Sequence, residues 1–156
     1  MSKKDIRYYW DLKGFTPNPK QEQAILHSEG PLFLTAGPGS GKTRVILWRT
    51  VNLIVFHQVD PKKIFLATFT EKAAHQLKDG LRSLLGLITN KTGQPYDISG
   101  MAIGTVHSIC QDILVDRYRV FSEDGVRSKA PILLDSLAQY FKIYRRSFWR
   151  ELLNAG

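Results

Sequence analysis

The sequence predicts an α/β fold with a doubly wound parallel sheet, and three observations support this prediction. Three short apolar segments, residues 32–35, 64–68 and 101–105, each end in threonine. Each is followed by apolar residues at helical spacing, which is typical of a strand and its crossover helix. The intervals between the segments accommodate one βαβ unit each. Because the carboxyl ends of parallel strands share one edge of a sheet, we expect the ligand site at these threonine-bearing ends.

Residues 36–43 form a complete phosphate-binding loop between the first apolar segment and its helix. Glycines at positions 37, 39 and 41 allow positive φ angles and let backbone N–H groups converge on phosphate oxygens. Lys42 is expected to pair with the β- and γ-phosphates, and the Thr43 hydroxyl to ligate Mg²⁺. The alternative is a glycine-rich turn with an incidental lysine, and it has to explain the whole run together with the strand and helix beside it.

Asn18 and Pro19 open a helix that is expected to run to His27, before the first strand. Asparagine is a favoured N-cap, and proline is a favoured first helical residue. Gln21 stands at the third helical position, where its side chain can complete a capping box. The same amide offers a donor and an acceptor together, as recognition of the adenine N6/N7 edge requires. On spacing alone, the capping role and the adenine contact both stay open.

The second strand ends in residues that suit single-stranded nucleic acid. Thr68 and Thr70 offer hydroxyls for phosphates, Phe69 offers a stacking surface, and Lys72 offers a positive charge. The alternative is structural: Thr70 caps the following helix, and Phe69 lies in the core.

The third strand ends in a similar turn with Thr105 and His107. These two residues either contact a phosphate or cap the next helix. Cys110 follows His107 by three positions, but its place on the apolar stripe predicts a core residue rather than a metal ligand or a nucleophile.

The composition limits the classes of protein to which this chain can belong. The chain has 156 residues, enough for one domain or for one domain and the start of a second. Lys and Arg number 22 against 14 Asp and Glu, and this net charge of +8 favours nucleic acid or an anionic membrane surface as partner. The single cysteine suits a reducing compartment. With no signal-peptide pattern and no apolar segment long enough for a bilayer, we expect a cytoplasmic protein without membrane association.

Two polar stretches divide the chain. Residues 90–100 contain two glycines and a proline and are predicted to form a surface loop. Residues 121–130 separate the strand-and-helix block from a further helical pattern. We expect one domain over residues 1–120 and the start of a helical subdomain over residues 121–156.

The order, spacing and content of these segments resemble the N-terminal half of the first motor subdomain of superfamily 1 DNA helicases of the UvrD/Rep/PcrA type. The resemblance covers residues 16–113, and the stretch after residue 121 is similar to the start of that family's inserted helical subdomain. It implies a P-loop NTPase fold of the RecA type, incomplete in this chain, with ATP and Mg²⁺ as cofactors. It also implies single-stranded and duplex DNA, together with the remaining helicase subdomains, as partners.

Four motifs of that family correspond to residues of this sequence. The Q motif, which recognises adenine, corresponds to Asn18 and Gln21. Motif I, which binds the nucleotide and contributes the catalytic residues Lys42 and Thr43, corresponds to Gly37, Gly39, Ser40, Gly41, Lys42, Thr43 and Arg44. Motif Ia, which contacts single-stranded DNA, corresponds to Thr68, Phe69, Thr70 and Lys72, with Glu71 in place of the usual Asn. Motif Ib corresponds to Thr105 and His107, with Val106 in place of Phe.

ATP hydrolysis needs one carboxylate for Mg²⁺ and a second one to orient the attacking water. The family supplies them from an apolar strand that ends in Asp-Glu, and this sequence contains no such pair. Asp116 and Asp135 each follow an apolar run, but the first continues a helical stripe and the second fits an N-cap. We therefore expect the ATP-binding part of an ATP-dependent DNA helicase, which alone hydrolyses little ATP. The alternatives are a stand-alone nucleotide- or DNA-binding accessory protein and a small P-loop kinase or GTPase.

Overall fold

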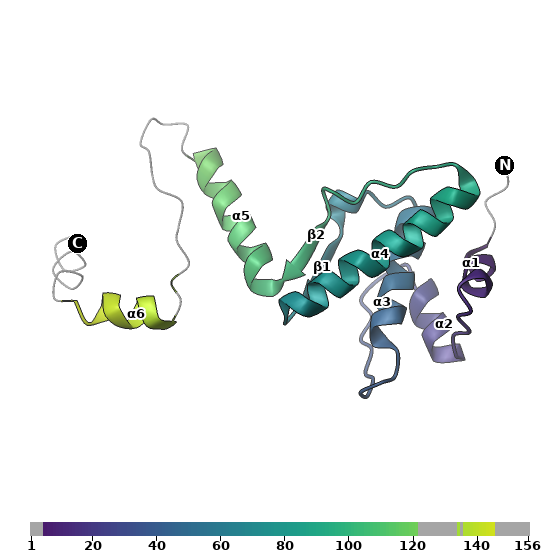
Figure 1. The fold of residues 1–156 in the computed structure, drawn as a ribbon, viewed down its shortest axis with the longest axis horizontal. Helices are drawn as coiled ribbons and strands as arrows, with labels where there is room; N and C mark the ends of the chain where they lie inside the picture. The colour runs from purple at the N-terminus through teal and green to yellow at the C-terminus, as the bar shows by residue number, and fades with distance from the viewer. Residues whose placement is uncertain (1–4, 122–133, 135, 146–156) are drawn as a thin grey trace. The chain divides into compact units, whose positions relative to one another are not determined.

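The computed structural model describes residues 5–121, 134 and 136–145 of the chain (Figure 1). By its internal contacts the chain divides into two compact units, Met1–Ile109 and Cys110–Gly156. The first unit contains α1 (Ile6–Leu12), α2 (Pro19–Leu26), α3 (Lys42–Val51), the π-helical turn η1 (Asn52–Phe56), the short 3-10 turn η2 (Pro61–Lys63), β1 (Phe65–Thr68), α4 (Glu71–Thr92) and β2 (Ala102–Thr105). Helix α5 (Val106–Phe121) begins in this unit and continues in the second, where α6 (Ser136–Ile143) follows.

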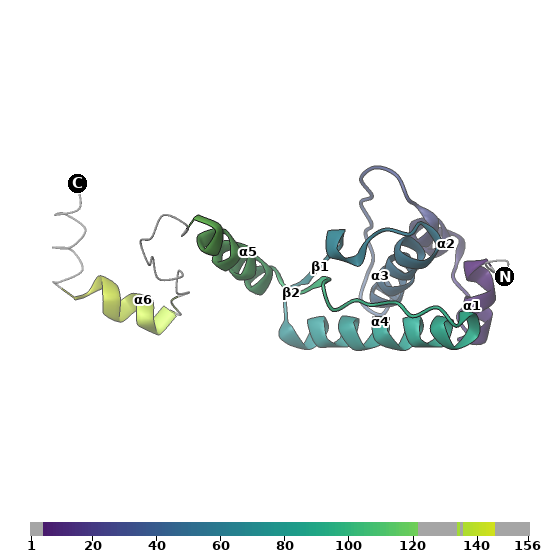
Figure 2. The same ribbon diagram turned by 90° about the horizontal axis from the view of Figure 1, so that it is seen from above.

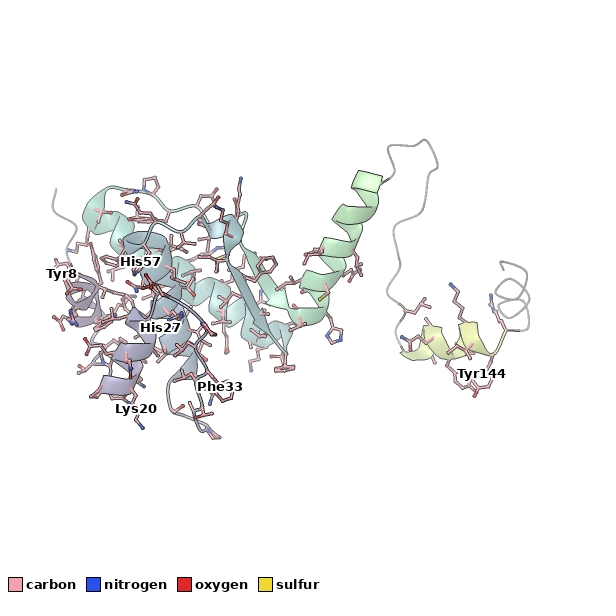
Figure 3. All side chains as sticks on the ribbon, turned by 180° about the vertical axis from the view of Figure 1, so that it is seen from behind. Tyr8, Lys20, His27, Phe33, His57 and Tyr144 are labelled. Atoms are coloured by element: carbon pink, nitrogen blue, oxygen red, sulfur yellow. The ribbon has the colours of Figure 1, made fainter. Side chains whose placement is uncertain are left out.

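The sheet of the described part consists of two parallel strands, β1 and β2, in which Thr68 lies opposite Thr105. Two of the three predicted strands are thereby confirmed, and their threonines meet at one edge. The prediction of a strand at residues 32–35 is wrong for this structure, because these residues form no ladder and Phe33 is 91% exposed (Figure 3). An apolar segment becomes a strand only when a neighbouring strand pairs with its backbone groups. Among the described residues, the β1–β2 pair is the whole sheet.

Helix α4 is the longest helix of the described part, with 22 residues, and it packs against both strands and α3 (Figure 2). The Thr70 hydroxyl caps its first turn by accepting the N–H of Ala73 at 3.2 Å, and Gly93 ends it with a φ of 72°. The apolar residues at helical spacing that were expected after the second strand form the buried stripe of α4, which consists of Ala74, Leu77, Leu81, Leu84, Leu85 and Ile88. This stripe is the largest single contribution of one helix to the core.

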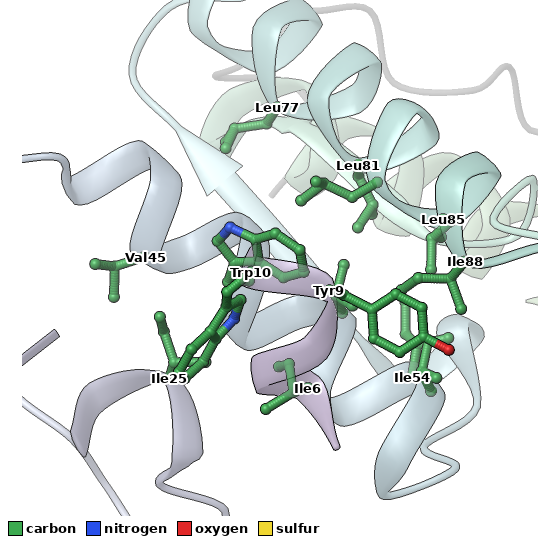
Figure 4. Close-up of a cluster of buried hydrophobic side chains, with 14 of the residues drawn as sticks. Ile6, Tyr9, Trp10, Ile25, Val45, Ile54, Leu77, Leu81, Leu85 and Ile88 are labelled. Atoms are coloured by element: carbon green, nitrogen blue, oxygen red, sulfur yellow. The ribbon is translucent and has the colours of Figure 1, made fainter. Parts of the chain in front are cut away.

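The core also gathers around α1, a helix that the apolar patterns did not predict. Asp5 caps α1, and Tyr9 and Trp10 are buried in a cluster shared with α2, α3 and α4 (Figure 4). Trp10 meets Trp48 of α3 edge-on at 6.5 Å between ring centroids, and Phe15 stacks on Trp48 at 6.0 Å. Aromatic pairs of this kind contribute about 0.5–1.5 kcal/mol beyond the burial of area. The segment before α2 therefore helps to hold α3, the helix that follows the glycine-rich loop.

The second unit is described through part of α5, residue 134 and α6. Cys110 is exposed in α5, so the expectation of a core position for this residue is wrong. Helix α6 falls within the predicted C-terminal helical pattern. The polar stretch after Phe121 lies outside the described residues, and the domain boundary at residue 120 stays a prediction. No helix in the described part of the chain is both long enough and apolar enough to cross a membrane.

Candidate nucleotide-binding site

The glycine-rich loop of residues 36–41 leads directly into α3. Gly39 and Gly41 have φ angles of 73° and 80°, a region that residues with a Cβ rarely adopt. Gly37, for which the sequence predicted the same freedom, is not among the residues with positive φ. Gly41 is the N-cap of α3, so the loop ends at the unpaired N–H groups of a first helical turn. Such a helix start favours phosphate groups.

Lys42 and Ser40 close this loop through main-chain carbonyls. The Lys42 ammonium donates to the carbonyl oxygens of Ala36 and Gly37 at 2.8 and 2.6 Å. The Ser40 hydroxyl also donates to the Gly37 carbonyl, at 2.7 Å. A phosphate oxygen is a charged and stronger acceptor than a carbonyl, so it would compete for the ammonium at the mouth of the loop. Thr43 is exposed in the first turn of α3.

Gln21 joins the start of α2 to the loop. Its Oε1 accepts the N–H of Asn18 at 2.9 Å, and the Asn18 side chain accepts the N–H of Gln21 at 2.9 Å, so the predicted capping box is present. Its Nε2 donates to the carbonyl oxygen of Ser40 at 3.0 Å. A side-chain amide has two lone pairs and two N–H groups, so one acceptor and one donor position remain. The capping role and the adenine contact are therefore compatible.

A pocket of about 190 Å³ lies where α2, the loop and α3 meet. Its lining residues are Asn18, Lys20, Gln21, Leu34, Thr35, Ala36, Ser40, Lys42 and Val45. The pocket thus joins the capping box to the lysine of the loop, and none of these lining residues is acidic. Lys20 was missed from the sequence. Its position between Asn18 and Gln21, on the first turn of α2, is the signal that could have revealed it.

The end of β1 is open to solvent. Phe69 is 98% exposed, so the core position considered for it is wrong. Thr70 does cap α4, and the Thr68 hydroxyl donates to the Thr70 carbonyl at 2.9 Å. Lys72 is exposed in the first turn of α4. An exposed aromatic ring with a nearby cation is an arrangement that can stack a base and attract a phosphate.

At the end of β2, the Thr105 side chain is buried and forms hydrogen bonds within the protein. Thr105 is 8% exposed, and its hydroxyl accepts the N–H of Ser108 at 3.1 Å at the start of α5. The Ser108 hydroxyl donates back to the Thr105 carbonyl at 3.0 Å. His107 is exposed. The structure therefore shows a capping role for Thr105, and a phosphate contact by either residue stays a prediction.

Comparison with known proteins distinguishes between the classes of nucleotide-binding protein that could have this site. The sequence matches the family described as UvrD/REP helicase N-terminal domain over residues 17–155. The chain belongs to this family. A UvrD/REP domain is consistent with the phosphate-binding loop and with the resemblance inferred from the four motifs.

Individual relatives of this UvrD/REP domain are named as helicases. The chain is 40% identical to ATP-dependent DNA helicase PcrA of Bacillus subtilis over 97 residues. It is 41% identical to ATP-dependent DNA helicase SRS2 of Saccharomyces cerevisiae over 99 residues, and 38% identical to DNA helicase II of Rickettsia typhi over 102 residues. The matches cover 62%, 62% and 65% of this chain but only 12%, 8% and 14% of the three relatives. The chain therefore spans a small part of the length of the curated relatives it matches.

Arg44, predicted to lie near the nucleotide, does not line the pocket of the UvrD/REP domain described above. Its guanidinium lies over the ring of Phe15, 5.5 Å from the centroid. Both residues line a separate pocket of about 230 Å³ together with Lys13 and Ser83. The role of Arg44 stays a prediction. The contact of Phe15 with Arg44 could not be predicted from the sequence, because a single aromatic residue outside any motif gives no signal.

The two candidates for a magnesium carboxylate receive no test from the structure. Asp116 belongs to α5, but its side chain is not described, and Asp135 lies outside the described residues. Across residues 5–114, 134 and 137–145, no three or more His, Cys, Asp or Glu side chains gather in a way that could hold a metal ion.

Proposed function

We propose that this UvrD/REP domain is the ATP-binding part of an ATP-dependent DNA helicase, with a P-loop fold of the RecA type. The observation that supports this most strongly is the meeting of Gln21, Ser40 and Lys42 at one pocket. In the whole protein, ATP hydrolysis would drive movement along single-stranded DNA and the unwinding of duplex DNA. The accessory-protein and small-kinase alternatives are not retained, because the family and the named relatives are helicases.

The triphosphate is assigned to the loop and the first turn of α3. Backbone N–H groups of Gly37, Gly39, Ser40 and Gly41 would donate to phosphate oxygens, and the Lys42 ammonium would exchange its two carbonyl acceptors for the β- and γ-phosphates. The exposed Thr43 hydroxyl fits Mg²⁺, which prefers oxygen ligands and keeps several waters. When bound, Mg²⁺ would neutralise phosphate charge. Arg44 would add further positive charge near the nucleotide.

The adenine base is assigned to Gln21, which Asn18 orients. The remaining lone pair of Gln21 Oε1 would accept from adenine N6, and the remaining N–H of Nε2 would donate to N7. Guanine presents an acceptor at position 6 and would leave Oε1 facing another oxygen. We therefore expect a preference for ATP over GTP.

Single-stranded DNA is assigned to the ends of the two strands. Phe69 would stack a base, and Lys72 would face a phosphate. The remaining contributors we assign to this surface are Thr68, Thr70, Thr105 and His107. Duplex DNA and the other helicase subdomains are the further partners of this proposal.

The decisive test is nucleotide binding by the purified chain and by its Lys42→Ala variant, followed with a fluorescent ATP analogue in the presence of Mg²⁺. Loss of a charge-assisted hydrogen-bond donor costs about 1.5–3 kcal/mol, so we expect binding to weaken roughly ten- to hundredfold. Lys78→Ala, which removes an exposed lysine from α4, is the matched control and should bind like the wild type. Equal binding by the Lys42→Ala variant and the wild type would contradict the proposal.

A further inference from the structure

The C-terminal end of α2 is held by two side chains from the segment that follows the loop. The Arg49 guanidinium, from α3, donates through Nη1 to the carbonyl oxygen of Ala24 at 2.8 Å and also to the carbonyl oxygen of His27. The Asn52 side chain donates through Nδ2 to the carbonyl oxygen of Ile25 at 3.1 Å. We call these two side chains, with their three carbonyl acceptors, the α2 clamp.

The α2 clamp uses groups that are costly to bury. Asn52 is 3% exposed and Arg49 is half-buried, and burial lowers the pKa of the Arg49 guanidinium. The ion pairs found among the described residues all involve Arg7, so no described carboxylate forms an ion pair with Arg49. The last carbonyls of a helix lack partners within the helix and carry partial negative charge. The carbonyl groups at the end of α2 therefore take the place of a carboxylate as partners of the Arg49 guanidinium.

The opposite end of the same helix carries the predicted adenine contact. Helix α2 has only eight residues, and a helix of this length is not stable by itself. Its first turn touches the loop through Gln21 and Ser40, and its last turn touches α3 and η1 through the α2 clamp. Both ends of α2 are thus fixed to the one chain segment that begins with the phosphate-binding loop. If the last turn were released, α2 could rotate about its contact with the loop, and the Gln21 amide would change its orientation there.

We propose that Arg49, assisted by Asn52, is a positioning residue for base recognition: it holds the last turn of α2 so that the Gln21 amide keeps its orientation at the phosphate-binding loop. Arg49 itself touches no ligand. The inference deepens the proposed function and rests on it for the identity of the ligand. Its structural content, the coupling of the last turn of α2 to the first, does not depend on any ligand.

The first experiment compares ATP, GTP and inorganic tripolyphosphate as ligands of the wild type and of Arg49→Ala, Arg49→Lys and Arg7→Ala. Arg7 is the matched control, because it also contacts α2, but through the side chain of Glu22 at 2.6 Å and not through a backbone carbonyl. Gln21→Ala is the positive control. We expect Gln21→Ala and Arg49→Ala to lose most of the preference for ATP over GTP, which one bidentate base contact sets at about tenfold. In Arg49→Ala, tripolyphosphate affinity should change less than about twofold, because the hydrogen bonds of Arg49 go to α2 and not to the loop.

A second experiment removes the dependence on ligand. Amide hydrogen exchange of Asn18 and Gln21, whose N–H groups form the capping box, is measured in the wild type, Arg49→Ala and Arg7→Ala. We expect Arg49→Ala to accelerate exchange at both positions by about tenfold, while the buried turns of α4 keep their protection. Arg7→Ala should leave exchange at these positions unchanged. Arg49→Lys keeps the charge but loses the fork of donors, and it decides the question in the same assays if Arg49→Ala does not fold.

Two results would overturn the inference. An equal loss of affinity for ATP and tripolyphosphate in the Arg49 variants would reduce Arg49 to a general stabilising role. Unchanged exchange at Asn18 and Gln21 would show that the two ends of α2 are independent. Failure of the wild type to bind any nucleotide would refute the proposed function, and the exchange experiment would still decide whether Arg49 positions Gln21.

Discussion

Phe69 shows how a single residue can be more informative in the structure than in the sequence. Its ring is 98% exposed, although a phenylalanine side chain is ordinarily expected in the core. The turn that presents it is held by Thr68 and Thr70, whose hydroxyl and backbone groups bond to each other and cap α4. The turn is therefore ordered without any contribution from the ring, which leaves the ring available for a partner.

We predict that Phe69→Ala weakens binding of single-stranded DNA by about 1–3 kcal/mol, the contribution of one stacked base, without changing the stability of the fold. Binding can be measured by fluorescence anisotropy of a labelled oligonucleotide, and stability by chemical denaturation. Phe33→Ala is the control, because Phe33 is 91% exposed but lies before the phosphate-binding loop. Equal losses for both variants would mean that DNA binding follows general surface hydrophobicity rather than a contact at Phe69.

The sequence predicted the local arrangement of Asn18 and Gln21 better than their contacts with distant segments. Spacing alone allowed Asn18 and Gln21 to form a capping box, and the structure has this box. The Ser40 carbonyl as a partner of Gln21, and Arg49 as a partner of α2, could not be predicted, because both contacts join segments that meet only after folding. Side-chain contacts with backbone carbonyls depend on distance in space and leave no trace in residue type.

At the scale of elements, the packing of α3 against α4 depends on a glycine. A Cβ added at Gly80 would lie 2.7 Å from Leu47 Cδ1, whereas a Cβ added at Gly86 of the same helix would meet nothing within 4 Å. Both glycines weaken α4 as a helix to the same extent. They therefore form a matched pair that separates helix propensity from packing.

We predict that Gly86→Ala stabilises the chain by about 1 kcal/mol, because alanine is the better helix former. Gly80→Ala should give no gain or a net loss, since overpacking against Leu47 costs about 1–3 kcal/mol. Urea denaturation followed by circular dichroism measures both. A similar gain in both variants would show that Leu47 moves aside and that the close approach of α3 and α4 is not required.

Helices with a long run of apolar residues at helical spacing were predicted well. Elements that form only through contacts with distant segments were not. The apolar stripe of α4 appears almost as predicted. The apolar segment at residues 32–35 forms no strand, because strand formation requires pairing that a local pattern cannot guarantee. Helix α1 went unpredicted, since its short aromatic and charged sequence shows no clear period, yet it supplies Tyr9 and Trp10 to the core.

At the scale of the whole molecule, the net charge indicates the sign of a partner's charge but not the class of the partner. A net charge of +8 attracts DNA and an anionic membrane surface alike, because long-range attraction depends on total charge. The family favours DNA over a membrane surface as the proposed partner, since the named relatives are DNA helicases. The motifs led to the same family because they record chemistry that composition does not.

The lining of the pocket beside the phosphate-binding loop leads to a prediction about ATP hydrolysis by the whole chain. The pocket beside the loop is lined by amide, hydroxyl, ammonium and apolar groups, and by no carboxylate. A lining without a carboxylate offers no general base to an attacking water and no anionic ligand to Mg²⁺. Binding and turnover should therefore separate in this chain.

We predict that the purified chain binds Mg²⁺-ATP but turns it over no faster than the Lys42→Ala variant, with or without single-stranded DNA. The measurement is phosphate release over hours at saturating ATP, with binding measured on the same preparation so that an inactive sample is recognised. DNA-stimulated turnover that Lys42→Ala abolishes would show that a carboxylate outside the lining of this pocket completes the site. In that case Asp116→Asn and Asp135→Asn would identify it, because each replacement keeps the size of the side chain and removes only the charge.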